Sequence, residues 1–342
     1  MANLTKAHQE LFRRAPDECF DSLPALARHC QAQKENAVDR WLPPYQLVPA
    51  PLEGNGLAVT LGEAGPFTMN DWSFTQLCQL AHVSKDTVNR LSPDTAYRVF
   101  RETIPIGNKP LQVFTQQQMV RSVHGVSYTR LHNADILGML SEFATDFQPP
   151  QKAMTGGTGL YAGEQDMFVF LIDPTGWAEI DGEAFAPGFF IWNSEVGKRS
   201  LGIETFWFQA VCQNHIVWDA VEVVEFTRKH TANVRESLGA IRAIVEQLVR
   251  RRDDRRDGFV RVIKKAMSEK LGADAEETLK AVTQHGVPKS LAKRALEIAQ
   301  QQGRFTIFSI VDALTRIAGE CEYAGDRTET DRQAAGLLAL AA

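Results

Sequence analysis

Positively charged side chains are the first feature of this sequence that points to a ligand. Between Arg228 and Lys265 there are twelve Lys or Arg and five Asp or Glu, a surplus of seven positive charges. Side chains of this type bind nucleic acids by neutralising phosphates. Aspartates are interleaved with the arginines of residues 250–257, so the run is equally typical of a solvated helix end whose charges compensate one another. The candidates for phosphate contact here are Arg250, Arg251, Arg252, Lys264 and Lys265.

A second group of positive side chains lies in a polar linker between two apolar segments. The linker, residues 193–199, ends in Lys198 and Arg199, and the flanking segments 185–192 and 200–218 have the composition of β-strands. This pattern predicts a long hairpin with two cations at its tip. A shorter hairpin is predicted upstream, with a turn at His124-Gly125. Its candidates for nucleic-acid contact are Arg121, Tyr128 and Arg130.

The segment 76–91 has the apolar spacing of a helix-turn-helix motif, with Ser84 as the cap of a second helix. His82 stands where the turn of that motif usually needs glycine. The same pattern is common in ordinary helical hairpins, so a structural helix pair is the alternative to DNA recognition.

Other chemistry-bearing motifs are incomplete. The glycine-rich segment 156–163 lacks the Gly-Lys-Ser/Thr ending of a phosphate loop and leads into a predicted strand, which favours a connector. Cys212, His215 and His230 lack a fourth ligand for zinc. No carboxylate has an identifiable partner base or nucleophile. We therefore predict no metal, no cofactor and no catalytic residue, and the sequence favours a protein that is not an enzyme.

The elements that position these residues predict an α+β fold. Strands are expected at residues 111–114, 119–131, 167–172, 185–192 and 200–218, and helices at 67–104 and 133–147 and almost throughout from residue 220. The last strand is apolar on both faces, which requires a cover on each side. We expect a central antiparallel sheet with a long hairpin, covered by helices, and a helical C-terminal region.

Three regions follow from this pattern. Residues 1–66 are expected to form a helical arm with two short helices and a Pro- and Gly-rich irregular or hairpin-like linker. Residues 67–230 form the α+β core with the helical hairpin and the sheet, and residues 231–342 the helical C-terminal region. The apolar surface of residues 185–218 exceeds what one small sheet can hide, so we expect a homo-oligomer.

Composition restricts the class of protein. The net charge of −5 argues against a protein that coats duplex DNA by bulk electrostatics. No apolar run is long enough for a membrane span, and residues 1–14 lack the apolar core of a signal peptide. The five cysteines are odd in number and widely spread, as reduced thiols are. These features predict a cytoplasmic protein with no membrane contact.

A short series of residues resembles the signature of the "domain of unknown function 932" family of phage- and plasmid-borne proteins. The series is Asn193, Ser194, Glu195, Gly197, Cys212, Asn214 and His230. This chain has His215 where the family prefers glycine or a small polar residue, and Gly125 near a position where it prefers serine. The resemblance implies a mobile-element setting and a common fold rather than a reaction.

Three functions remain open at this stage. The first is binding or annealing of single-stranded DNA in phage or plasmid recombination or replication, for which a basic groove with stacking side chains suffices. The second is a non-catalytic interaction with a host or element-encoded protein in conflict or plasmid maintenance. The third is a hydrolase or nuclease with a dispersed site.

Overall fold

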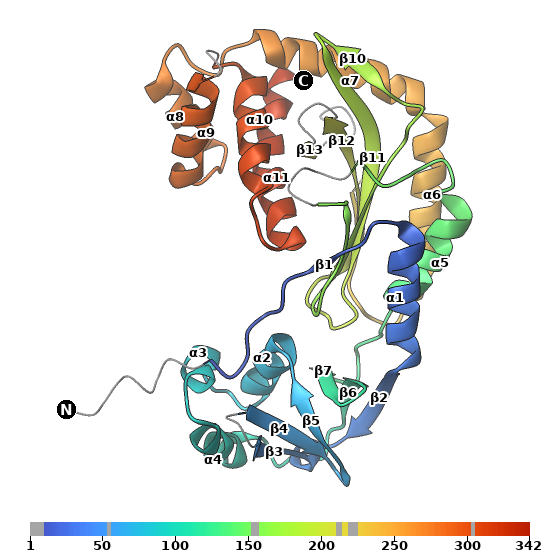
Figure 1. The fold of residues 1–342 in the computed structure, drawn as a ribbon, viewed down its shortest axis with the longest axis vertical. Helices are drawn as coiled ribbons and strands as arrows, with labels where there is room; N and C mark the ends of the chain where they lie inside the picture. The colour runs from blue at the N-terminus through green and yellow to red at the C-terminus, as the bar shows by residue number, and fades with distance from the viewer. Residues whose placement is uncertain (1–9, 53–55, 152–156, 210–213, 218–224, 302–304) are drawn as a thin grey trace, which may run out of the picture.

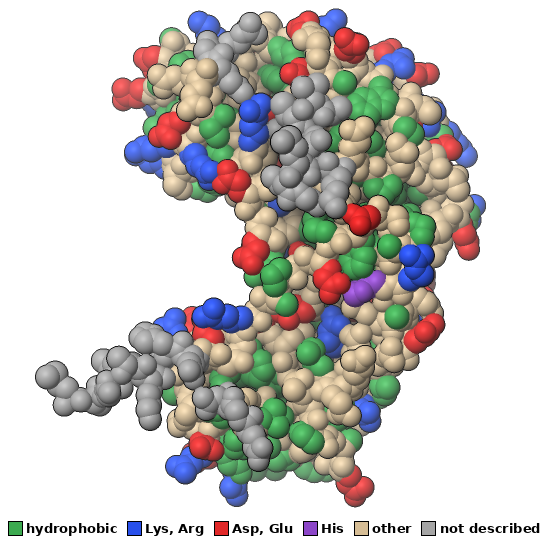
Figure 2. All heavy atoms as spheres, viewed as in Figure 1, with side chains coloured by type: hydrophobic (Ala, Val, Ile, Leu, Met, Phe, Trp, Pro, Cys, Tyr) green, Lys and Arg blue, Asp and Glu red, His purple; other side chains and the backbone are tan. Residues whose placement is uncertain are grey.

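The computed structural model describes residues 10–52, 56–151, 157–209, 214–217, 225–301 and 305–342. The chain forms a small N-terminal lobe, residues 37–124, and a large lobe built from β1 (Glu18–Cys19), α1 (Leu23–Glu35) and the residues after 132. Figure 1 shows the two lobes arranged as a C, and Figure 2 shows the surface hollowed between them.

The small lobe is built on a six-stranded sheet in the order β2-β6-β7-β5-β4-β3. Neighbouring strands are antiparallel except β5 and β7, which are parallel. The strands are β2 (Ala37–Leu42), β3 (Leu47–Leu52), β4 (Gly56–Leu61), β5 (Ala64–Met69), β6 (Leu111–Gln116) and β7 (Met119–His124).

This sheet must curl, because its two edge strands are joined by a very short link. The five residue steps from Leu42 to Leu47, through the 3-10 turn η2 (Pro44–Gln46), extend over at most about 18 Å. Six strands laid flat would span about 24 Å. Leu42 and Leu47 are both buried in one core, which the curled sheet encloses.

Three helices close this core: α2 (Asp71–Leu80), α3 (Lys85–Asn89) and α4 (Pro93–Thr103). The start of α2 is set by a capping box, because the Asn70 side chain accepts from the Ser73 amide at 2.8 Å and the Ser73 hydroxyl accepts from the Asn70 amide at 3.0 Å. Phe74 and Phe100 then pack edge to face in the core, with ring centroids 5.9 Å apart.

The large lobe is built on an eight-stranded antiparallel sheet in the order β1-β8-β9-β11-β12-β13, with β10 paired to β11 and β14 to β12. Its strands are β1 (Glu18–Cys19), β8 (Leu160–Ala162), β9 (Met167–Ile172), β10 (Ala178–Ile180), β11 (Glu183–Asn193), β12 (Leu201–Gln209), β13 (Asn214–Val217) and β14 (Glu225–Arg228). The predicted long hairpin is β11–β12, paired from Phe185↔Gln209 to Trp192↔Gly202.

Helices cover both faces of this sheet. Phe189 and Ile191 face α1, α5 (Asn133–Phe143) and α6 (Ser237–Arg250), whereas Phe190 and Trp192 face α11 (Ala324–Leu338). The remaining helices are α7 (Arg252–Ser268), α8 (Ala275–Gln284), α9 (Lys289–Gln301) and α10 (Ile307–Ala318), with 3-10 turns η3 (Val234–Glu236) and η4 (Ala339–Ala341). The α+β class, with a helical C-terminal region, is confirmed.

The expectation that the strand of residues 200–218 needs a cover on both faces is met for β12, where Ile203 and Phe206 lie in separate cores within one chain. A second copy is therefore not required to hide residues 185–209. The homo-oligomer stays a prediction, but the apolar surface of residues 185–209 on which it partly rested is covered within one chain.

The division into three regions differs from the structure. Residues 37–69 form four strands that share one sheet with β6 and β7, so the linker is not irregular; its hairpin-like alternative is observed, because β3, β4 and β5 pair antiparallel in sequence order. Of the two short helices expected in residues 1–40, the second is α1, and the first falls largely on residues 1–9, outside the described residues. Residues 67–104 begin in β5, and β14 interrupts the helical region expected from residue 220.

Two expectations about surroundings can be compared with the described residues. None of their helices combines the length and apolar character that crossing a bilayer demands. The described cysteines are free thiols; Cys30 and Cys78 are buried, and burial raises the pKa of each to about 12, whereas Cys19 is exposed.

Candidate nucleic-acid interface

The turn between β11 and β12 docks against the small lobe, where Trp72 Nε1 donates to the Val196 carbonyl at 2.7 Å, instead of projecting into solvent. Asn193 donates from Nδ2 to the Leu131 carbonyl at 3.0 Å and to Asn133 Oδ1 at 2.7 Å. The Ser194 hydroxyl donates to the Gln165 carbonyl at 2.5 Å. Both side chains are fully buried. The first part of the expected tip, Asn193 to Glu195, is thus buried at the junction between the lobes.

Glu195 is the charged centre of this junction. Its carboxylate accepts from the Asn133 amide at 2.7 Å and lies 3.5 Å from His132 Nδ1. Burial alone would raise the pKa of Glu195, but the hydrogen bond and charge of His132, together with the Asn133 amide, outweigh it and hold the pKa below its usual value. The carboxylate is therefore ionised, and its hydrogen bond from the Asn133 amide fixes the start of α5.

The two arginines predicted from the upstream hairpin are also used inside the molecule. Arg130 donates to the Glu195 carbonyl, pairs with Asp39 at 2.8 Å and lies 3.6 Å over the ring of Phe114. Arg121 is buried and donates to Gln116 and, at 3.1 Å, to the Glu164 carbonyl. Neither guanidinium faces solvent, so neither is positioned to contact a phosphate.

Tyr128 lies in a stack of three rings at the same junction. Its ring is 3.7 Å from His124 and 5.4 Å from His230, and its hydroxyl donates to the Glu195 carbonyl at 2.9 Å. Gly197 passes this stack with φ +73°, and a Cβ there would come within 2.6 Å of His124 Cε1. Both the dihedral angle and the close approach require glycine.

The two predicted tip cations have different surroundings. Lys198 is exposed, and its ammonium lies 4.7 Å from the ring centre of Trp72. Arg199 pairs with the buried Asp166 at 2.9 Å and packs against Gly325 of α11. Lys198 is thus the more accessible of the two.

The residues that carry the family resemblance are partly brought together. Asn193, Ser194, Glu195, Gly197 and His230 all lie at the junction. Cys212 lies outside the described residues, and Asn214 begins β13, with a side chain that is not described. The zinc site considered for Cys212, His215 and His230 cannot be compared with the structure, because Cys212 and the His215 side chain lie outside the described residues. Among the described residues, no group of side chains that could bind a metal was found.

The arginine run at the α6–α7 boundary is largely neutralised. Arg252 pairs with Asp173 and lies 3.9 Å from Asp146. Arg256 pairs with Asp253 at 3.0 Å. Arg250 is exposed, whereas Arg251 is half-buried and has an interaction partner of its own. Figure 2 shows blue and red side chains alternating on the edge of the molecule over these helices. The arginines of residues 250–257 therefore fit the interpretation of a helix end whose charges compensate one another.

The second half of α7 is different, because its cations are exposed and share one helix face. Arg261, Lys264 and Lys265 have i, i+3, i+4 spacing, which places them side by side. Among the residues that the structure describes, Arg261 and Lys264 have no ion-pair partner. Lys265 donates only to the Ala342 carbonyl, at 3.4 Å. We call these three residues the α7 basic face; the helical spacing of Arg261 could have identified it from sequence.

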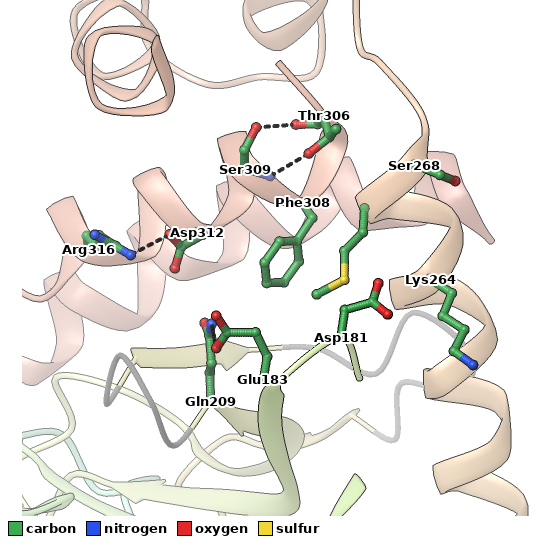
Figure 3. A pocket seen from close by; sticks show the side chains of 11 residues that line it. Asp181, Glu183, Gln209, Lys264, Ser268, Thr306, Phe308, Ser309, Asp312 and Arg316 are labelled. Carbon is green, nitrogen blue, oxygen red and sulfur yellow. Dashed lines mark hydrogen bonds and ion pairs between the residues drawn. The ribbon is translucent and has the colours of Figure 1, made fainter. Parts of the chain in front are cut away.

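A pocket of about 370 Å³ opens beside the α7 basic face, and Lys264 belongs to both. The β10–β11 turn contributes Asp181 and Glu183, and α10 contributes Phe308. Figure 3 shows the Phe308 ring directed from α10 toward Glu183 and the neighbouring Gln209. Pockets of this size accept small organic ligands.

Hydrogen bonds hold the walls of this pocket in place. Gln209 donates to Glu183 at 2.9 Å, and Arg316 pairs with Asp312 at 2.9 Å. Thr306 caps α10 by accepting from the Ser309 amide at 3.2 Å. The pocket therefore combines an aromatic ring, carboxylates and cations at fixed positions.

The helix-turn-helix segment forms a helix pair with a short second helix. The turn has His82 at φ 55°, the left-handed conformation for which the motif's glycine is suited. However, α3 has only five residues, and Asn89 at its end is held by two hydrogen bonds to the Phe12 backbone. A helix of this length, about 7 Å, offers little surface to a DNA groove. The glycine-rich segment, where described, leads into β8 and not into a helix.

No family model, no curated protein and no solved structure matches this chain. The resemblance to the family of unknown function therefore stays a prediction, and the function has to be argued from the geometry of the chain itself.

Proposed function

We propose that this protein binds single-stranded nucleic acid along the α7 basic face, as a phage or plasmid protein of recombination or replication would. The observation that carries the proposal is the exposure of three cations on adjacent turns of one helix. Over the four residue steps from Arg261 to Lys265 the helix rises about 6 Å, so these side chains present a short row of positive charge. A row of this kind tracks a phosphate backbone.

A single strand fits this surface better than a duplex does. The net charge of the chain is −5, and Asp253, Asp254 and Asp257 precede the basic row on the same helix. A duplex would bring its second strand and many more phosphates against this mixed surface. The neighbouring pocket, by contrast, is accessible only to a base that is not paired and stacked.

The expected binding is weak and depends on salt. Three phosphate contacts predict that the logarithm of the association constant falls with the logarithm of salt concentration with a slope of about −2. Fluorescence anisotropy with a labelled single-stranded oligonucleotide between low and physiological salt measures this slope. Absence of binding to the oligonucleotide at low salt would refute the proposal.

A double substitution tests the location. Arg261→Glu with Lys265→Glu reverses two charges of the α7 basic face and leaves Lys264 and the pocket lining intact; we expect at least tenfold weaker binding. The matched control is Arg98→Glu with Lys280→Glu, an arginine and a lysine that are exposed on α4 and α8. It makes the same change in net charge, so equal losses in both proteins would show that only the total charge matters. A strand-annealing assay with complementary oligonucleotides then shows whether binding leads to annealing.

A protein-interaction function is the alternative, and one observation favours it. Trp41 on the edge strand β2 is 53% exposed. Tyr45, in the link between the two edge strands, is 49% exposed, and Val48, on the other edge strand β3, is 47% exposed. Large apolar side chains beside open strand edges are typical of surfaces that bind other chains. A pulldown that recovers a host or element-encoded partner with the wild type and loses it with Trp41→Glu would support this alternative.

A further inference from the structure

We infer that the pocket between α10 and the β10–β11 turn accepts a nucleobase with an exocyclic amino group, and that it prefers cytosine to thymine. The inference deepens the proposed function, on which it rests for the strand that delivers the base. The pocket itself can be tested separately with free nucleosides.

The aromatic wall supplies the surface on which a base would stack. Phe308 is a half-buried ring that lines the pocket and is braced by Phe185, with ring centroids 6.2 Å apart in an edge-to-face arrangement. Met267 lines the same space. An aromatic face held from behind and open in front is the usual stacking platform for an unpaired base. A volume of about 370 Å³ accommodates one base with its sugar.

The carboxylates supply the selectivity. Glu183 accepts one hydrogen bond from Gln209 and, as a carboxylate, retains capacity for further donors. Asp181 lies on the same turn and is exposed at the pocket rim. Carboxylates accept from the N4 amino group of cytosine, whereas the corresponding O4 of thymine is an acceptor and is repelled. The acidic lining therefore favours a base that presents an amino group.

Lys264 connects the pocket to the α7 basic face. It is exposed, lines the pocket and follows Arg261 by one turn of the helix. A phosphate bound at Lys264 would place the attached sugar and base at the pocket mouth, while the next phosphate along the strand meets Arg261 or Lys265. Asp181 and Glu183 on the β-strand side of the pocket repel a phosphate, so the base and not the backbone is assigned to it.

The experiment uses the full chain with methyl-labelled methionine and follows the Met267 signal by NMR during titration with deoxycytidine and with thymidine. We expect saturable shifts with deoxycytidine at a dissociation constant on the order of 1 mM, as for a small ligand without phosphate contacts, and at least threefold weaker binding of thymidine. Phe308→Leu, which keeps an apolar side chain against Phe185, should weaken both nucleosides about tenfold. Oligo-dC should likewise bind more tightly than oligo-dT.

Glu183→Gln tests the selectivity without changing side-chain size. It should remove the preference for deoxycytidine and leave thymidine binding unchanged or stronger. The matched control is Glu179→Gln, an exposed glutamate on β10 of the same hairpin that does not line the pocket; it should retain the preference.

The outcomes separate the two proposals. If deoxycytidine shifts Met267 but no oligonucleotide binds, the pocket inference stands and the proposed function falls. If oligonucleotides bind through the α7 basic face while neither nucleoside shifts Met267 and oligo-dC and oligo-dT bind equally, the pocket inference is overturned. Equal binding of deoxycytidine and thymidine, or a preference that survives Glu183→Gln, also overturns it.

Discussion

The stacked rings at the junction of the lobes should make stability depend on pH through two histidines. Burial lowers the pKa of His124 to about 4, and the positive charge of Arg130 adds to this effect. Burial likewise lowers the pKa of His230 to about 4. Both imidazoles are therefore neutral in the folded protein at pH 7, and His124 Nε2 lies 3.0 Å from the Val196 carbonyl.

The sign of the effect follows from proton binding. Between pH 6.5 and pH 4 the unfolded chain protonates these histidines and the folded chain does not, so the free energy of unfolding falls as pH decreases through this window. For a pKa of 6.5 in the unfolded and about 4 in the folded state, each histidine lowers stability by about 2 kcal/mol between pH 7 and pH 5. Below pH 4 the loss is complete.

Glu164 acts in the opposite direction over the same range, which decides how the experiment must be designed. Burial, with the negative charge of Asp71, raises the pKa of Glu164 to about 7, so the folded state takes up a proton there and gains stability as pH falls toward 4.5. The pH slope of the wild type is therefore a sum of opposing contributions. Only the difference between the wild type and a histidine variant isolates one ring.

His230→Phe supplies that difference, because phenylalanine keeps a ring beside Tyr128 and cannot titrate. Urea unfolding followed by tryptophan fluorescence at pH 7 and pH 5 should show a loss about 2 kcal/mol smaller in the variant than in the wild type. His285→Asn, at an exposed histidine, is the control and should follow the wild type. An identical pH dependence of the wild type and His230→Phe would refute the assignment of a neutral, buried imidazole.

Further predictions concern other parts of the structure. Glu164→Gln should raise the free energy of unfolding at pH 8 by about 1 kcal/mol, after allowance for its partial exposure, and leave it nearly unchanged at pH 5; equilibrium unfolding at the two pH values measures this. Gly197→Ala should cost about 2–3 kcal/mol, because of its positive φ and the approach to His124, whereas Gly286→Ala, also at positive φ but with open space around it, should cost about 1 kcal/mol. Equal costs for the two glycines would contradict the close packing at the junction.

Much of the large lobe could be predicted from the sequence because its signals are local. The apolar side chains of residues 200–218 occupy both alternating positions, which predicted a strand buried on two faces, and the structure buries Ile203 and Phe206 of β12 in separate cores. In the small lobe, the strands of residues 37–69 were not assigned, because Pro49 and Pro51 look like breakers of structure. Both lie in β3, an edge strand, the position in a sheet that tolerates proline.

The candidate site was less predictable, because whether a charged side chain is paired or accessible depends on residues far away in the sequence. Arg130 finds Asp39 across 91 positions, and Arg199 finds Asp166 across 33. Spacing along the chain carries no information about such pairs. The exposed cations of α7 differ, since helical spacing alone places Arg261 beside Lys265 on a single face.

This contrast changes what the conspicuous polar turn is expected to do. A buried carboxylate with satisfied hydrogen bonds, such as that of Glu195, contributes little net stability, but losing one partner leaves an uncompensated charge. A network in which Glu195 and Asn193 both bind Asn133 at the start of α5, while Arg130 connects the Glu195 carbonyl to Asp39 of β2, therefore permits one arrangement of the lobes and penalises others. Side chains committed in this way cannot also bind a mobile ligand. A function for this protein is therefore to be sought where cations and carboxylates remain accessible, at α7 and its pocket, while the turn determines how the two lobes are joined.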